Sequence, residues 1–271
     1  MPPTSSPRRA ARTSRGAVGR RAARPGAAPR RRLSVIGVLG EVLITAGAIV
    51  ALFLGWYVWF DDIVSGEQQQ QAAVEVQQEL QQQWERGEGV TKPSADPGEP
   101  VVAPLADAGD VFATLIIPRF GEDYVRPITG GVDPATVLNN RQRGIGHYLD
   151  TQMPGDLGNF AIAAHRTTYG APFAQIADLR VGDRVYVETA DGWYEYAFRG
   201  LEYVWPTGVD VLAPVPTAPA LAATDRVLTM TSCNPRFSTA ERIIAYAVLD
   251  AWYPRAGGPP AEISTLVEAQ N

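Results

Sequence analysis

Three side chains that could do chemistry together lie at the ends of apolar, strand-like segments. Cys233 is the only cysteine of the 271-residue chain and ends segment 226–233. His165, one of two histidines, ends segment 159–165, and Arg242 begins the next apolar segment nine residues after Cys233. A thiol needs a neighbouring base or cation to act as a nucleophile, and attack on a carbonyl needs positive groups or N–H donors for the oxyanion. The trio indicates cysteine-based acyl transfer, with an inert buried cysteine as the alternative.

The segments that must position these residues have the composition of β-strands. Branched and aromatic residues recur between turn signals in six places, and Asp191-Gly192 marks a hairpin turn. The expected strands are 111–118, 124–128, 159–165, the hairpin 184–204, 226–233 and 242–253, with a brief helix at 133–143. Seven or so strands with only short helices predict an all-β fold, a closed barrel over residues 110–255. If 226–233 and 242–253 are antiparallel neighbours, Arg242 lies beside Cys233.

Before the barrel, residues 42–60 contain no charged side chain. As a helix, this run would be about 28 Å long, close to the hydrocarbon thickness of a bilayer. Trp56, Tyr57 and Trp59 cluster at its end, as interfacial aromatic residues do. The pattern predicts a single transmembrane anchor over residues 33–60. A buried core helix and a cleaved signal peptide are the alternatives, although the run is long for a signal peptide and ends without small residues.

Charge is divided sharply along the chain, whose formal net charge is −5. Residues 1–32 contain ten arginines and no acid, and nothing in them could form a core, so we expect a disordered tail. The body holds all 29 acidic residues, which argues against nucleic-acid binding. Arginines before the span, and Asp61 and Asp62 after it, predict a cytoplasmic N-terminus and an extracellular catalytic domain.

Two further segments contain no candidate catalytic or binding residues. Residues 61–109 are interpreted as a Gln-rich stalk followed by a Pro-rich linker. Ala73, Val76, Leu80 and Trp84 give the stalk one narrow apolar stripe. A solvated spacer is the favoured interpretation, and packing on a partner is the alternative. Residues 256–271 are expected to be a short C-terminal tail.

Cysteine and histidine counts limit the other possible sites. One cysteine excludes an intramolecular disulfide and a multi-cysteine zinc site, and two histidines leave little material for a metal centre. Extracellular proteins usually pair their cysteines, so an unpaired one suggests a reactive thiol. No cofactor is required by this chemistry, and no metal site is legible.

Four segments together carry a resemblance to a known family. They are GIGHY (144–148), PGDLGNFAIAAHRTT (154–168), TMTSCNPR (229–236) and RIIAYA (242–247). On these motifs the chain resembles the sortases, and is most similar to the class E sortases of actinobacteria. The match departs from the usual pattern mildly at Met230, Ser232 and Ala164.

The resemblance implies a fold, an activity and three catalytic residues. Sortases are membrane-anchored cysteine transpeptidases built on an eight-stranded β-barrel. They cleave a C-terminal sorting signal of the LPxTG type after Thr through a thioester, then join the Thr carbonyl to a cell-wall amine. By position, Cys233 matches the nucleophile, His165 the catalytic histidine and Arg242 the catalytic arginine. Arg236 is a less favoured candidate for the arginine.

Four residues are candidates for substrate binding. The resemblance places His147 in a wall of the substrate groove, with a purely structural histidine as the alternative. Tyr148 matches a feature linked to LAxTG-like signals. Thr231 and Ser232 offer hydroxyl groups to the peptide backbone, or simply end a strand.

The expected partners are secreted proteins with a sorting signal, a peptidoglycan precursor amine and the lipid bilayer. Two other functions remain open at this stage. A pilin-polymerising sortase would use a lysine as the acceptor, but no lid motif precedes the barrel. A non-enzymatic, membrane-tethered barrel that binds wall polymers would leave Cys233 inert.

Overall fold

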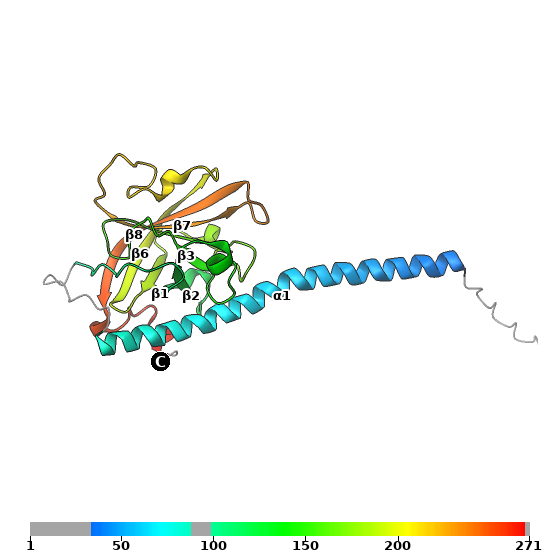
Figure 1. Cartoon of the computed structure of the whole chain (residues 1–271), viewed down its shortest axis with the longest axis horizontal. Helices are drawn as coiled ribbons and strands as arrows, with labels where there is room; N and C mark the ends of the chain where they lie inside the picture. Colours follow the sequence, from blue (N-terminus) through cyan, green and yellow to red (C-terminus); the bar gives the residue numbers. More distant parts are fainter. Residues whose placement is uncertain (1–33, 88–98, 269–271) are drawn as a thin grey trace, which may run out of the picture. The chain divides into compact units, whose positions relative to one another are not determined.

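Eight strands close into a barrel, which confirms the predicted all-β fold. The computed structural model describes residues 34–87 and 99–268. The strands are β1 (Val111–Ile116), β2 (Val125–Gly130), β3 (Ile145–His147), β4 (Gly158–Ala164), β5 (Arg184–Glu188), β6 (Gly192–Val204), β7 (Arg226–Asn234) and β8 (Glu241–Pro254). Their order around the barrel is β1-β2-β3-β4-β7-β8-β6-β5, and β5 pairs with β1 to close it. Figure 1 shows the barrel with six of these strands labelled.

The directions of β4, β7 and β8 place the ends of β4 and β7 and the start of β8 at one edge of the barrel. β4 and β7 pair in parallel, so both strands end at the same edge. β8 runs antiparallel to β7, and its first residues therefore lie beside the last residues of β7. The interior is filled by branched and aromatic residues from every strand, including Leu115, Ile162 and Tyr196, all at most 1% exposed.

Several short elements complete the domain. The expected helix at 133–143 is one short helical turn over Pro134–Leu138, capped by Asp133, whose side chain accepts from the Thr136 N–H. Strand β3 was not foreseen, because three residues with two glycines nearby carry little strand signal. Its backbone nonetheless pairs with both β2 and β4.

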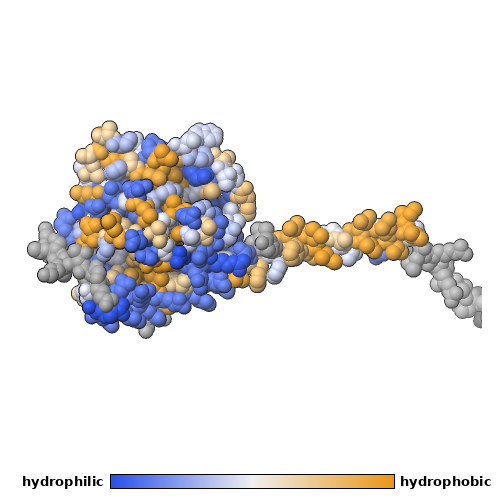
Figure 2. Space-filling model, in the orientation of Figure 1, coloured by the Kyte–Doolittle hydropathy of each residue, from blue (hydrophilic) through white to orange (hydrophobic). Residues whose placement is uncertain are grey.

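A helix of 52 residues, α1 (Val35–Arg86), precedes the barrel. It is the one helix among the described residues that is long and apolar enough to cross a membrane. Figure 2 shows apolar side chains along its N-terminal part. The chain divides into two compact units inside α1, after Ile49. The contacts described below all lie within the second unit. Outside the described residues lie residues 1–32, the side chains of Tyr57 and Trp59, and residues 88–98 of the expected linker.

The Gln-rich part of α1 differs from the expected solvated spacer. It packs against the barrel of the same chain, with a buried residue every three or four positions. The buried side chains are Ser65, Gln69, Ala73, Gln77 and Leu80. Of the predicted apolar stripe, Val76 and Trp84 are only half-buried. The packing surface is partly polar because glutamine amides on this face bond to barrel groups.

The C-terminal residues also pack on the barrel rather than trailing from it. Ile263 and Val267, the latter within α2 (Ser264–Glu268), join Ala73 of α1 over an outer face of β1, β2 and β5. Tyr186 of β5 donates a hydrogen bond to Glu262 at 2.6 Å. The tail and α1 therefore cover one face of the barrel together.

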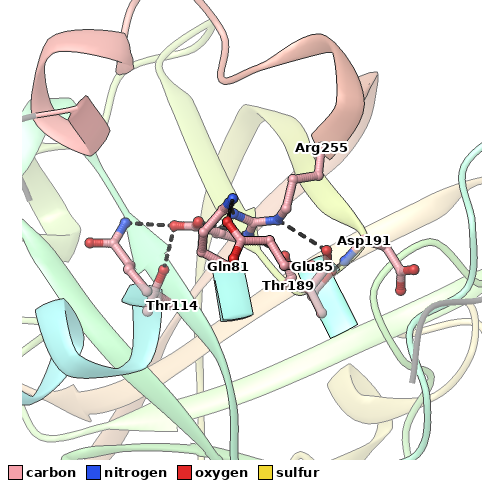
Figure 3. Close-up of polar contacts among 9 residues, drawn as sticks. Gln81, Glu85, Thr114, Thr189, Asp191 and Arg255 are labelled. Atoms are coloured by element: carbon pink, nitrogen blue, oxygen red, sulfur yellow. Dashed lines mark hydrogen bonds and ion pairs between the residues drawn. The ribbon is translucent and has the colours of Figure 1, made fainter. Parts of the chain in front are cut away.

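A buried ion pair lies beneath α1. Arg255, just after β8, donates to Glu188 at 2.8 Å, and both side chains are at most 3% exposed. Gln77 donates to the same carboxylate at 2.5 Å, while Gln81 accepts from Arg255 at 3.1 Å. Figure 3 shows this group, which also includes Thr114 at 3.2 Å from Glu188. α1 is thus attached to the barrel through charged and amide groups.

Candidate active site

The barrel topology brings the three predicted catalytic residues to one edge. Cys233 is half-buried near the end of β7, and Arg242 of β8 is its direct cross-strand partner. β4 and β7 pair in parallel up to Ala163 and Thr231, and His165 follows β4 by one residue. Continuing this register by two residues places His165 next to Cys233. By backbone register, Cys233 therefore lies between Arg242 on β8 and His165, which directly follows β4.

The imidazole of His165 is held by a side chain that the sequence did not indicate. Its Nε2 lies 2.8 Å from Oδ1 of Asn139. Because an amide oxygen only accepts, Nε2 carries the proton and Nδ1 of the neutral ring keeps a lone pair. The ring of Tyr169 packs against His165, with centroids 5.3 Å apart. Burial lowers the pKa of His165 below its ordinary value, so the neutral ring is favoured at neutral pH.

Arg242 is positioned by the backbone at the start of its own strand. Its Nη1 donates to the carbonyl oxygens of Thr239 at 3.1 Å and Glu241 at 3.0 Å. The guanidinium has five N–H groups, so others remain for a substrate oxygen. Arg236, the alternative arginine, is exposed and lies over the Phe237 ring, 5.9 Å from its centroid.

A chain of hydrogen bonds supports the site from the three strands that form it. Arg166, which follows His165, donates to Oδ1 of Asn234 at 2.5 Å. The amide nitrogen of Asn234 donates to Glu241 at 2.8 Å. These contacts join the ends of β4, β7 and β8. Arg166 is buried and has this supporting role.

A small cavity of about 70 Å³ lies beside the site. Tyr148, Thr231 and Arg242 are among its lining residues, and the Tyr148 hydroxyl lies 3.2 Å from Oγ1 of Thr231. The segment after β6 also lines this cavity, and its Trp205 and Val209 are more than two-thirds exposed. The cavity could thus take a small apolar side chain close to Cys233.

The other two candidate substrate-binding residues face the protein. Ser232 is 4% exposed and donates its hydroxyl hydrogen bond to the Ala164 carbonyl at 2.7 Å, which ties β7 to β4 next to His165. His147 is 1% exposed and packs on Phe112 and Phe160. Its Nε2 lies 3.1 Å from the Gln152 carbonyl. This burial favours the structural alternative for His147.

His147 should make the fold acid-sensitive. Burial lowers the pKa of His147 from 6.5 to about 4. The unfolded chain therefore binds a proton there more readily, and stability is complete above pH 6.5 and decreases as pH falls from 6.5 toward 4. We expect this residue to account for a loss of about 3 kcal/mol by pH 4. His147→Phe, which has no titrating ring, should flatten the dependence of urea unfolding on pH between 6.5 and 4. An unchanged slope in this variant would contradict the assignment.

The described residues form no candidate metal site. Within residues 34–87 and 99–268, no group of three or more His, Cys, Asp or Glu side chains is arranged to hold an ion.

Asn139, Tyr169 and Asn234 were all missed from the sequence. Asn234 follows the cysteine directly, and its position at a strand end was a usable signal. Asn139 and Tyr169 lie in loops, 26 residues before and four after His165. Nothing in their local sequence indicates that those loops fold onto the histidine.

Comparison with known proteins gives the family. The model of the sortase domain matches residues 115–250. Sortase SrtE1 of Streptomyces coelicolor is 35% identical over 246 residues, which cover 89% of this chain and 63% of that protein. The chain thus spans less than two-thirds of the length of this relative.

Solved structures agree with the sequence matches. The SrtA sortase from Actinomyces oris is 37% identical, with a TM-score of 0.57, covering 60% of this chain and 92% of that one. Sortase E1 from S. coelicolor, solved with a tripeptide in its active site, is 36% identical, with a TM-score of 0.53, covering 58% and 99%. The region matched by the family model, 115–250, contains most of the barrel and includes Cys233, His165 and Arg242. The chain belongs to the sortase family, and its relatives include class E sortases.

Proposed function

We propose that this protein is a cysteine transpeptidase in which Cys233, His165 and Arg242 carry the reaction. The observation that supports it best is the convergence of three strands: β4 and β7 end together, and Arg242 pairs across from Cys233. The substrate would be a secreted protein with a sorting signal of the LPxTG type, and LAxTG is the expected variant. The acceptor would be a peptidoglycan precursor amine.

The chemistry proceeds in two acyl transfers. In the first, His165 takes the proton of the Cys233 thiol, the thiolate attacks the Thr carbonyl carbon, and the C–N bond to Gly breaks as His165 gives that proton to the leaving amine. In the second, the acceptor amine attacks the thioester, His165 takes its proton and the thiolate leaves. Asn139 occupies Nε2, so Nδ1 is the nitrogen that exchanges protons. Arg242 stabilises the negative charge on the carbonyl oxygen in both steps.

The cavity lined by Tyr148 and Thr231 would hold the residue that is Ala or Pro in the signal. Its volume of about 70 Å³ favours a small side chain. α1 would anchor the protein in the membrane, with the N-terminus cytoplasmic and the barrel outside, where sorted proteins arrive.

Mass spectrometry of the full chain in detergent tests this function. After mixing with an LAxTG peptide, we expect an adduct on Cys233 with the mass of the peptide cut after Thr. An LPxTG peptide should give it more slowly, and Cys233→Ala should give none. Absence of adduct with both peptides would refute the substrate assignment. A faster adduct with LPxTG would refute the expected LAxTG preference.

A further inference from the structure

The loops that contact His165 are themselves held by α1. Gln69, buried on the barrel-facing side of α1, donates its amide hydrogen to the Tyr169 carbonyl oxygen at 2.8 Å. Tyr169 is the residue whose ring packs on His165. Tyr169 therefore connects α1 to the imidazole: its carbonyl oxygen accepts from Gln69, and its ring packs on His165.

The loop of Tyr169 has an unfavourable backbone. Tyr169, Gly170 and Ala171 have φ values of 53°, 80° and 42°. Two of these three residues carry a Cβ, and side chains with a Cβ disfavour this left-handed region. Such a conformation persists only where its surroundings hold it in place. The Gln69 amide supplies one such contact, and the Gly170 N–H interacts with the carboxylate of Asp62, also on α1.

Gln69 also reaches the loop that carries Asn139. A Cβ built on Gly144 would lie 2.3 Å from Nε2 of Gln69, and one built on Gly170 would lie 2.9 Å from its Oε1. The amide therefore fills a slot between the two loops. Both glycines also have a φ of 80°, a backbone conformation that side chains with a Cβ disfavour. Arg141, two residues after Asn139, forms an ion pair with Asp61 of α1. The two loops that hold His165 thus share one support.

We propose that α1 is a positioning element of the active site, in which Gln69, with Asp61 and Asp62, holds the two loops that place Asn139 and Tyr169 on His165. This inference rests on the role of His165 in the proposed function. In this proposal, the part of α1 that follows the apolar run positions active-site loops as well as joining the barrel to the anchor. Loss of the Gln69 contact would let the Tyr169 ring leave the imidazole, which would become more hydrated.

The pKa of His165 reports directly whether the Tyr169 ring covers the imidazole, and its measurement needs no substrate. The chain has only two histidines, so ¹³Cε1-histidine labelling of the full chain in detergent gives two NMR signals to follow against pH. The titratable Tyr169 packs on the ring and the neutral Asn139 bonds to it, while the strand register places Cys233 next to His165 and Arg242 on the far side of Cys233. In Gln69→Leu we expect the pKa of His165 to rise toward its ordinary value, because the ring loses its cover. His147 should keep its titration.

Gln77→Leu is the matched control. Gln77 is a buried glutamine on the same face of α1, two turns further on, and it bonds to Glu188 rather than to a loop at the site. It should leave the His165 titration unchanged. Gln69→Leu should also lower kcat/KM for peptide transfer about tenfold, with Gln77→Leu near wild type. An equal shift of His165 in both variants would overturn the proposal, because it would make helix docking in general the cause.

Tyr169 variants test the contact between the loop and His165 without changing α1, so folding is less at risk. Tyr169→Ala should raise the pKa of His165, and Tyr169→Phe, which keeps the ring, should retain the wild-type value. An unmoved His165 signal in both Gln69→Leu and Tyr169→Ala would refute the inference. If wild type gives no peptide adduct, the proposed function fails, while the NMR result still decides the role of α1.

Discussion

Replacing His165 with alanine is expected to slow thioester formation on Cys233 by about 10³-fold. The imidazole both raises the thiolate population and gives the leaving amine its proton, and no other described side chain at this edge can exchange a proton near neutral pH. His165 is half-buried and lies after β4, so its truncation removes no strand pairing. The rate of adduct formation with the peptide, followed by mass spectrometry of the full chain in detergent, measures the effect.

The other histidine supplies the control for this experiment. His147 is buried between Phe112 and Phe160 and contributes no exposed surface to the site. His147→Phe should therefore form the adduct at a rate within about threefold of wild type at pH 7.5, where His147 is neutral. A His165→Ala protein that reacts as fast as His147→Phe would show that Cys233 is activated by another group.

The chemistry of this site could be predicted from the sequence because it lies at strand ends. A strand has a strong local signal, and a Cys or His at its end is positioned as soon as the pairing is known. The pairing of β7 with β8 follows from their proximity in the chain, so Arg242 opposite Cys233 was expected and is found. The parallel pairing of β4 with β7 joins residues about 68 apart and could not be derived from spacing.

Local sequence patterns did not predict the contacts that polar side chains make between distant segments. Gln69 and Gln77 look like solvent-exposed residues in a Gln-rich run, and their burial depends on the barrel face that receives them. Asn139 has no local feature that pairs it with His165. Arg255 was placed at the boundary of the domain, yet it is 6% exposed and bonds to Glu188. Burial of polar groups is decided by their partners, which local patterns do not identify.

Arg255→Met should destabilise the folded protein by about 3–5 kcal/mol, the largest stability effect that we expect from one substitution. The change leaves the Glu188 carboxylate buried without its cation, and removing one partner of a buried pair has a cost of this size. Arg255 also donates to the carbonyl oxygens of Thr189 at 2.6 Å and Ala190 at 3.0 Å, which would lose their donor. It further lies 4.6 Å from the centroid of the Trp193 ring. Urea unfolding of the full chain in detergent, followed by tryptophan fluorescence, measures the change.

Two comparisons separate the buried charge from other causes. Arg119 and Asp183 form a two-point ion pair at 2.7 Å, but the Arg119 side chain is 37% exposed and solvent screens the pair, so Arg119→Met should lower the free energy of unfolding far less than Arg255→Met. Adding Glu188→Gln to Arg255→Met removes the unpaired charge and should recover part of the loss. If the double variant is no more stable than Arg255→Met alone, the cost comes from lost packing around Arg255.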